Sequence, residues 1–207
     1  MQVVLKLRPE EGGVLLMFAP AGVIGYIGLN SMGLGLVTNQ LYAPPQLGLS
    51  GYFIMRRHLS CHTVQEVLTW LDNNEIGSAS NYLFGRCDGP HRRCRVRERK
   101  DWYDRRSLSV PHETLSVRGN GDLDNGARNL ANSHYRLERA SSLFGDGAGY
   151  DNALAASQDH EGLPTSVCRH DTEMVTGASI LIELDSSRML VGKGNPCVGK
   201  YETYKVA

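Results

Sequence analysis

One strand of this chain has a nearly bare face that ends in a carboxamide. Residues 21–41 read AGVIGYIGLNSMGLGLVTNQL, and their period of two predicts a β-hairpin whose turn takes a positive φ from Asn30. In the second strand Gly33, Gly35 and Asn39 share one face, so another molecule could approach the backbone closely there. A packed helix could instead fill the same space. A phosphate loop is disfavoured, because no Lys-Ser or Lys-Thr follows the glycines.

Three potential metal ligands lie close together in the sequence, at Cys87, His91 and Cys94. A zinc finger needs a second ligand pair at a characteristic spacing, and none follows. We therefore predict no metal site.

The chain has five cysteines, an odd number without CxxC spacing. Such a pattern is typical of unpaired intracellular thiols rather than of a disulfide framework.

A basic run at residues 91–106 offers a different chemistry. Eight of its residues are Arg or Lys and three are Asp or Glu, and Trp102 and Tyr103 accompany them. Basic residues beside aromatic rings can bind nucleic acid, although a solvated loop would have the same composition. The whole chain carries 22 basic and 22 acidic residues, which disfavours a surface that tracks nucleic acid throughout.

The length and composition predict one ordinary globular domain. With 207 residues, 41% of them hydrophobic, the chain can bury a sizeable core. No apolar run reaches membrane-spanning length, and the first residues lack the charged start and cleavage site of a signal peptide. We therefore expect a soluble, cytoplasmic protein without contact to membranes.

The elements that must position these residues alternate between strands and helices. A capping box, Thr63 with Glu66, followed by apolar residues at helical spacing, predicts a helix at 63–72. The other predicted elements are strands at 3–8, 14–18, 78–85, 177–184, 188–192 and 201–206, and helices at 53–59 and 153–158. Residues at about 89–150 show neither period, so we predict an irregular or disordered segment there. The fold class is α+β, in a single domain over 1–207.

The ordered motifs of the chain resemble one protein family. GVIGYIGLNSMGLGLVTNQL, the helix at 63–72, SASNYLFG, Asn132 before SHY, DHEGLPTSVCRH, and GASILIEL through GNPC follow one another in this order. The chain resembles the acyl-coenzyme A:6-aminopenicillanic acid acyltransferase family of cysteine N-terminal-nucleophile hydrolases. The resemblance covers most of 1–88 and 150–207. It implies an αββα sandwich, here incomplete at its N-terminus.

The resemblance also implies acyl transfer or amide hydrolysis through a cysteine thioester. On the family pattern, Asn39 and Asn132 would donate hydrogen bonds to the oxyanion, and Arg169 would favour the thiolate. Ser166 and His170 would contact the substrate, which is an amide or another small-molecule acyl donor. No cofactor is implied, and acyl-coenzyme A could serve as a substrate. Each residue also has a structural alternative: Asn39 could cap a strand, Asn132 could lie in a loop, and Arg169 could pair with an acidic neighbour such as Asp159 or Glu161.

The nucleophile of the family has no counterpart in these residues. The family places its cysteine before the strands that open this chain, often after a glycine, whereas none of the cysteines here follows a glycine. Cys168 and Cys197 lie in other family motifs, and Cys61 leads into a helix. We expect the chain to be inactive alone, as a fragment completed by a separate chain or as a relative that has lost catalysis. A non-catalytic small-molecule binding domain is the alternative, and a nucleic-acid-associated protein using residues 91–106 is the third hypothesis.

Overall fold

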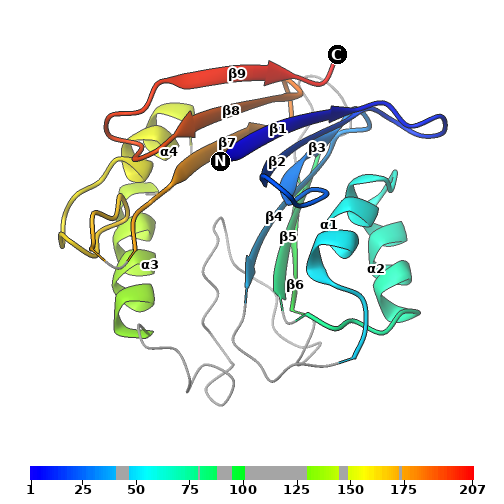
Figure 1. Ribbon diagram of the computed structural model, residues 1–207, viewed down its shortest axis with the longest axis horizontal. Coiled ribbons are helices and arrows are strands. Elements are labelled where there is room, and N and C mark those ends of the chain that lie inside the picture. Colours follow the sequence, from blue (N-terminus) through cyan, green and yellow to red (C-terminus); the bar gives the residue numbers. More distant parts are fainter. Residues whose placement is uncertain (41–46, 79, 88–94, 101–129, 145–148, 173) are drawn as a thin grey trace.

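A computed structural model describes residues 1–40, 47–78, 80–87, 95–100, 130–144, 149–172 and 174–207 (Figure 1). In these residues all strand pairs are antiparallel, and they form two sheets. The larger sheet has the order β1 (Gln2–Leu7), β2 (Leu15–Pro20), β3 (Ile27–Asn30), β4 (Leu34–Gln40), β5 (Ser80–Arg86), β6 (Arg95–Lys100). The smaller sheet has the order β7 (Ala178–Glu183), β8 (Arg188–Lys193), β9 (Tyr201–Lys205).

The helices cover the outer faces of the two sheets. Helices α1 (Gly51–Leu59) and α2 (Val64–Asp72) lie against the larger sheet, and α3 (Leu130–Phe144) and α4 (Tyr150–Ser157) flank the smaller one (Figure 1). Helix α4 packs on β7, and β3 contacts β8 across the two sheets. The layers therefore run helix, sheet, sheet, helix, which confirms the predicted α+β sandwich. No described helix has the length and apolar character that a membrane crossing would need.

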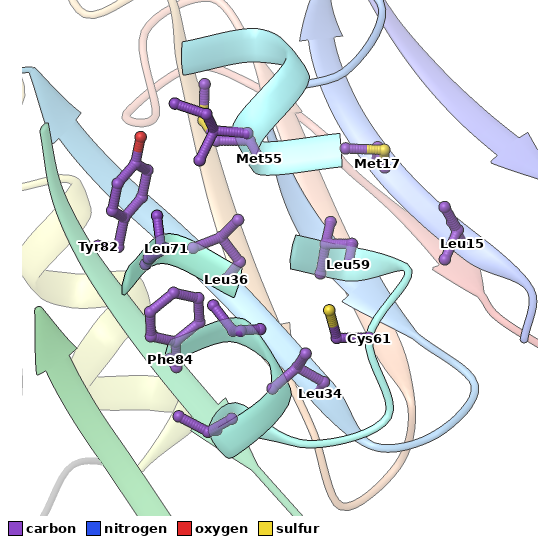
Figure 2. Packing of buried hydrophobic residues seen from close by; sticks show 13 residues of the cluster. Leu15, Met17, Leu34, Leu36, Met55, Leu59, Cys61, Leu71, Tyr82 and Phe84 are labelled. Carbon is purple, nitrogen blue, oxygen red and sulfur yellow. The ribbon is translucent and has the colours of Figure 1, made fainter. Parts of the chain in front are cut away.

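Strand β2 belongs to both hydrophobic cores of the sandwich. Leu15 and Met17 pack in a cluster under α1 and α2 (Figure 2), whereas Leu16 and Phe18 pack against Met189 and other residues of the smaller sheet. Because successive strand residues point to opposite faces, a strand that is buried on both faces must be apolar at every position. Full burial of each such side chain stabilises the fold by about 1.5–3 kcal/mol.

The predicted hairpin is present as β3 and β4, but its turn differs from the prediction. Asn30 has no positive φ; Gly33 has it instead, at 83°. The Asn30 side chain is fully buried, and its Oδ1 accepts hydrogen bonds from the backbone N–H groups of Met32 and Leu34, each at 3.0 Å. Its Nδ2 donates to the carbonyl oxygens of Leu59 (2.8 Å) and Cys61 (3.0 Å). The asparagine therefore ties the hairpin to the α1–α2 connection.

The bare face of β4 receives one leucine from the smaller sheet rather than a helix. A Cβ added at Gly35 would lie 2.5 Å from Leu184 Cδ2, and one added at Gly85 on the neighbouring β5 would lie 2.5 Å from Leu184 Cδ1. The two glycines therefore form the space into which Leu184 fits. At Gly35 the bare face is therefore covered by Leu184, and the two sheets pack together there.

Two sequence predictions are wrong: that residues 89–150 are irregular, and that the cysteines are all unpaired. Strand β6 and helix α3 are regular elements in the range that was expected to be irregular, and the rest of that range, apart from the start of α4, lies outside the described residues. Helix α3 escaped prediction because its contact face is largely polar. Cys87 is disulfide-bonded, so the five cysteines are not all free thiols. Most of the basic run 91–106 is likewise outside the described residues.

The predicted helix at 63–72 is confirmed as α2, and it provides a test of the first core. Leu71 is only 3% exposed in that core, whereas Leu68 is partly buried at its edge. Leu71→Ala should lower the free energy of unfolding by about 2–5 kcal/mol, the usual cost of a truncated core leucine. Leu68→Ala should cost less, near 1 kcal/mol. Urea unfolding of both variants checks this, and equal losses would contradict the described packing.

The contact between the sheets gives a second test. Gly35→Ala should lower the free energy of unfolding by about 1–3 kcal/mol, because the new methyl group would overlap Leu184. In the double variant Gly35→Ala, Leu184→Ala the overlap is gone, so its loss should be smaller than the sum of the two single losses. A double-mutant cycle by urea unfolding measures the coupling. Strict additivity would mean that the two residues do not touch.

Candidate active site

One face of helix α3 holds the connection between α4 and β7. Asn132, Arg136 and Arg139 follow one another at intervals of four and three residues, so they lie on the same side of the helix. The Arg136 Nη2 donates to the carbonyl oxygen of Val167 at 3.4 Å. Helix α3 therefore supports the segment that carries Ser166, Arg169 and His170.

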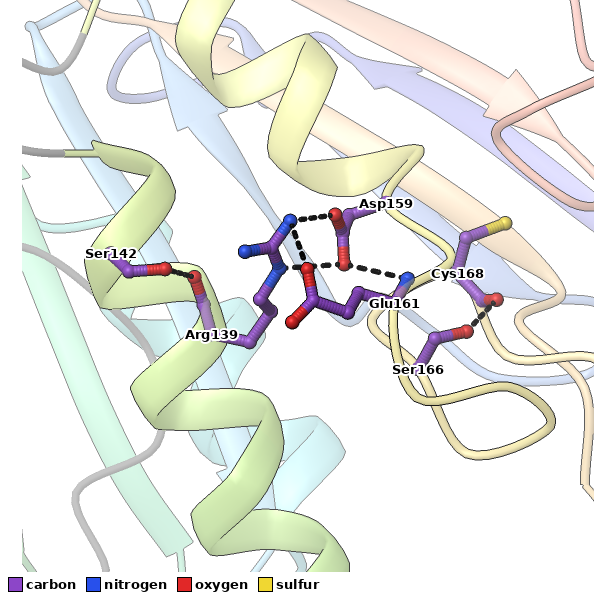
Figure 3. A network of polar contacts seen from close by, with 6 residues as sticks. All are labelled: Arg139, Ser142, Asp159, Glu161, Ser166 and Cys168. Atoms are coloured by element: carbon purple, nitrogen blue, oxygen red, sulfur yellow. Dashed lines mark hydrogen bonds and ion pairs between the residues drawn. The ribbon is translucent and has the colours of Figure 1, made fainter.

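An ion-pair network fixes the start of this connection (Figure 3). Arg139 donates from Nε and Nη2 to the two carboxylate oxygens of Asp159, at 3.1 and 2.7 Å, and its Nη2 lies 3.0 Å from Glu161 Oε2. Asp159 Oδ2 also accepts from the backbone N–H of Glu161 (3.2 Å), and the Asp159 carbonyl oxygen accepts from the N–H of Cys168 (2.9 Å). The acidic residues that could have paired with Arg169 therefore pair with Arg139.

Arg169 is a buried cation whose two terminal nitrogens have different partners. It is 5% exposed, and its Nη2 donates to Asp171 Oδ2 at 2.8 Å. The Asn132 amide satisfies both of its neighbours when Oδ1 accepts from Arg169 Nη1 and Nδ2 donates to the Thr165 carbonyl oxygen, each at 3.0 Å. Backbone contacts also hold Arg169, because its N–H donates to Thr176 Oγ1 at 2.8 Å and its carbonyl oxygen accepts from the Thr176 N–H at 3.0 Å. The guanidinium therefore has a fixed position.

A second arginine lies close enough to Arg169 to affect it electrostatically. Burial, and then the charge of Arg169, hold the pKa of Arg136 below its usual range. The Nε atoms of both arginines are buried and have no hydrogen-bond partner among the described residues. An anionic or strongly polar group beside either Nε would satisfy that donor. The site is therefore electropositive.

The five predicted site residues fall into two groups. Asn132 and Arg169 meet at the α3 face, and Ser166 and His170 lie on the same connection as Arg169. The Ser166 Oγ donates to the Cys168 carbonyl oxygen at 2.6 Å, and the His170 Nε2 lies beside Cys168 Sγ and Cys197 Sγ. Asn39 lies near the end of β4, and no hydrogen bond among the described residues joins it to Asn132 or Arg169. The roles of these residues in binding or catalysis stay predictions.

The free cysteines in the described part of the chain are poor candidates for an activated nucleophile. Burial raises the pKa of Cys61, which is 2% exposed in the core under α1 and α2. Burial likewise raises the pKa of Cys168. A nucleophilic thiol needs the opposite shift and access to substrate. The third free cysteine, Cys197, is half-buried beside Cys168.

A set of metal-ligating side chains also surrounds His170, and sequence reasoning missed it. The Nε2 of His170 lies 3.4 Å from Cys168 Sγ and 3.5 Å from Cys197 Sγ, and the ring of His160 is 5.0 Å from that of His170. The Cys168-x-His170 pair was the available signal. It was overlooked because its partners lie at spacings that match no zinc-finger pattern.

The ion-pair network predicts a defined pH dependence of stability. The hydrogen bonds from Arg139 hold the pKa of Asp159 below its ordinary value. A carboxylate with a lowered folded-state pKa stabilises the fold above its unfolded pKa of about 3.9 and loses this effect as the pH falls through the folded value. Arg139→Gln should therefore destabilise the protein near neutral pH, and this loss should shrink in acid. Urea unfolding at several pH values measures it, with Lys200→Gln as an exposed control; a pH-independent loss would contradict the ion-pair argument.

Comparison with known proteins agrees with this architecture. A sequence search against curated proteins finds no match. Among solved structures, a mutant of conjugated bile acid hydrolase from Clostridium perfringens is similar at 13% identity and a TM-score of 0.50, over 93% of this chain and 81% of that one. Penicillin V acylase from Agrobacterium tumefaciens is 13% identical with a TM-score of 0.47, over 87% of this chain and 66% of that one, so this chain spans just under two thirds of that acylase.

These neighbours have the N-terminal-nucleophile hydrolase fold, and the first supports the same sandwich for this chain. The family profile of acyl-coenzyme A:6-aminopenicillanic acid acyl-transferase matches residues 3–196, which is nearly the whole sequence. The matched range contains β2 to β6 of the larger sheet, helix α3, and strands β7 and β8 of the smaller sheet. This protein therefore belongs to the acyl-coenzyme A:6-aminopenicillanic acid acyl-transferase family.

Proposed function

We propose that this protein contributes the binding and electrostatic part of an acyltransferase or amide hydrolase site. The observation that carries the proposal is the buried Arg169, which Asn132 and Asp171 hold in one orientation. A fixed cation in a site with little water favours a thiolate over a thiol and stabilises negative charge that develops during reaction. Small-molecule amides and acyl donors such as acyl-coenzyme A are the substrate class that fits this chemistry.

The reaction proceeds through a thioester. The α-amine of the N-terminal cysteine takes the thiol proton, and the thiolate attacks the carbonyl carbon of the substrate, whose oxygen becomes an oxyanion. The carbonyl then re-forms, and the amine or thiol leaves with the proton that the α-amine returns. Water or a second amine next attacks the thioester and releases the acyl group. Arg169 stabilises the attacking thiolate, and Asn39 donates to the oxyanion. No cofactor takes part.

Asn132 acts mainly as a positioning residue for Arg169. Its Oδ1 is occupied by the guanidinium, and one of the two hydrogens on Nδ2 is directed at the Thr165 carbonyl oxygen. One hydrogen on Nδ2 remains for a substrate or oxyanion. Asn132 can therefore donate this hydrogen to an oxyanion while its Oδ1 holds Arg169 in place.

The nucleophile is supplied from outside residues 1–207, by a separate chain or by another segment of the natural protein. The three free cysteines among the described residues support this proposal, because Cys61 and Cys168 have raised pKa values and lie buried, and Cys197 Sγ lies beside His170 Nε2. A cytoplasmic location would keep a thiol nucleophile reduced, although the disulfide of Cys87 is unusual for that compartment. A non-catalytic small-molecule binding domain is the second candidate, favoured by the same engagement of the free cysteines.

The purified 207-residue chain should show no turnover and no acyl adduct. We expect this with both acyl-coenzyme A thioesters and N-acyl amides, because no described free thiol is activated. Product release and intact mass after substrate addition are the measurements. An acyl adduct on Cys61, Cys168 or Cys197 would show that the chain carries its own nucleophile.

The coding sequence upstream of Met1 provides the matching positive test. An in-frame cysteine there should give an extended chain that forms a thioester. In that protein Arg169→Met should lower kcat/KM by about 10- to 1000-fold near neutral pH, since an adjacent positive charge lowers a pKa by about 1–3 units. The rate should recover at higher pH, Arg169→Lys should restore part of it, and the exposed Arg57→Met should change nothing. Full activity of Arg169→Met would refute its role, and the lack of any thioester would favour the binding domain.

A further inference from the structure

Four side chains from two distant segments form a compact group of sulfur and nitrogen atoms. They are His160, Cys168 and His170 from the α4–β7 connection, and Cys197 from the loop between β8 and β9. Their ligand atoms all lie within 4.8 Å of one another. The loop that carries Cys197 follows β8 directly, so the group joins the α4–β7 connection to the edge of the smaller sheet.

Two nitrogen–sulfur distances in this group already match those of a tetrahedral centre. A zinc ion with bonds of about 2.3 Å to sulfur and 2.0–2.1 Å to nitrogen holds neighbouring sulfur and nitrogen ligands about 3.5 Å apart. The His170 Nε2 lies 3.4 Å from Cys168 Sγ and 3.5 Å from Cys197 Sγ. The ring centroids of His160 and His170 are 5.0 Å apart, with 74° between the two ring planes. A small closure of the group around His160 would complete the four positions.

We propose that His160, Cys168, His170 and Cys197 bind a structural zinc ion. Two sulfur and two imidazole ligands are a donor set that favours zinc in tetrahedral geometry, and four protein ligands leave no open position for catalysis. Both cysteines are free thiols, and Cys168 is buried. Binding of zinc expels the proton of each thiol, so that two thiolates balance the charge of the ion. The proposal is independent of the proposed acyl chemistry.

The ion fastens the loop that presents Arg169. Its ligands Cys168 and His170 flank Arg169 in sequence, and the Arg169 carbonyl oxygen accepts from Asn195 Nδ2 at 2.9 Å. The Gln158 Nε2 donates to the carbonyl oxygen of Pro196 at 3.1 Å, so direct hydrogen bonds already connect the same two segments. Zinc that binds the native state and not the unfolded state would stabilise the fold by its binding free energy, in addition to these hydrogen bonds.

A disulfide between Cys168 and Cys197 is the competing chemistry. Its formation would oxidise the two thiols, require an external oxidant and remove both sulfur ligands. The two states differ in thiol count, in mass and in metal content, so one preparation can distinguish them.

The test uses the full 207-residue chain, purified under reducing conditions, stripped of metal with a chelator and reloaded with Co²⁺ or Zn²⁺. We expect one metal ion per chain by elemental analysis, together with protection of two thiols from alkylation. Co²⁺ should give the visible bands of tetrahedral cobalt and near-ultraviolet charge transfer from thiolate, both lost on addition of Zn²⁺. Zinc should also raise the melting temperature of the wild-type protein.

Variants then assign the ligands. Cys168→Ser, Cys197→Ser, His160→Gln and His170→Gln should each weaken zinc binding by at least about 100-fold, because even partners outside the ligand shell contribute 10- to 100-fold. Cys61→Ala and His62→Gln remove the same chemical groups outside the cluster and should keep wild-type affinity, with circular dichroism as a check on folding. The proposal is overturned if reduced wild-type protein gives no tetrahedral cobalt spectrum, if Cys168→Ser binds zinc normally, or if a Cys168–Cys197 disulfide survives reduction.

Discussion

The contact of Leu184 with the backbones of two glycines sets the distance between the two sheets. Side chains at Gly35 and Gly85 would hold the smaller sheet away from β4 and β5, since any Cβ there would overlap the leucine. Close approach lets Leu16 and Phe18 of β2 pack with Met189 and Val191 of β8 in one core. Leu184 directly follows β7, and β7 begins where the connection that carries Arg169 ends. The position of the site relative to the larger sheet therefore depends on this contact.

Helix α3 determines the shape of the α4–β7 connection through polar contacts. Arg139 meets Asp159 with two hydrogen bonds, Arg136 reaches the Val167 carbonyl oxygen, and Asn132 reaches Thr165 and Arg169. Each contact gives part of the connection a partner that an apolar face could not provide, because the connection exposes carbonyl oxygens and charged side chains. The rigidity of the site thus comes from hydrogen bonds and ion pairs, whereas the rigidity of the sheets comes from apolar burial.

This division explains which parts could be predicted from the sequence. Strands and the capped helix α2 have local patterns, in which apolar period and the Thr63–Glu66 pair depend only on near neighbours. Helix α3 has a polar contact face, so its sequence gives no apolar period to recognise. The turn at Asn30 depends on Leu59 and Cys61, which lie about thirty residues away and become neighbours only in the fold. The cysteine and histidine group has the same property: its residues lie in the motifs DHEGLPTSVCRH and GNPC, but the family resemblance, which predicted Arg169 and Asn132, assigned no metal-binding role to them.

The charges around Arg169 show why a metal ion there would be compatible with an electropositive site. Arg169 is paired with Asp171, and the pKa of Arg136 is lowered first by burial and then by Arg169, so positive charge is already crowded in this region. A bare divalent cation nearby would increase that repulsion. Two thiolates cancel the charge of a zinc ion, while neutral imidazoles complete the shell. The loop could then be fastened beside Arg169 without changing the field that Arg169 exerts on a bound acyl group. A pair of carboxylates in place of Cys168 and Cys197 would cancel the same charge but would prefer harder ions, so the choice of sulfur ligands is the feature that selects zinc.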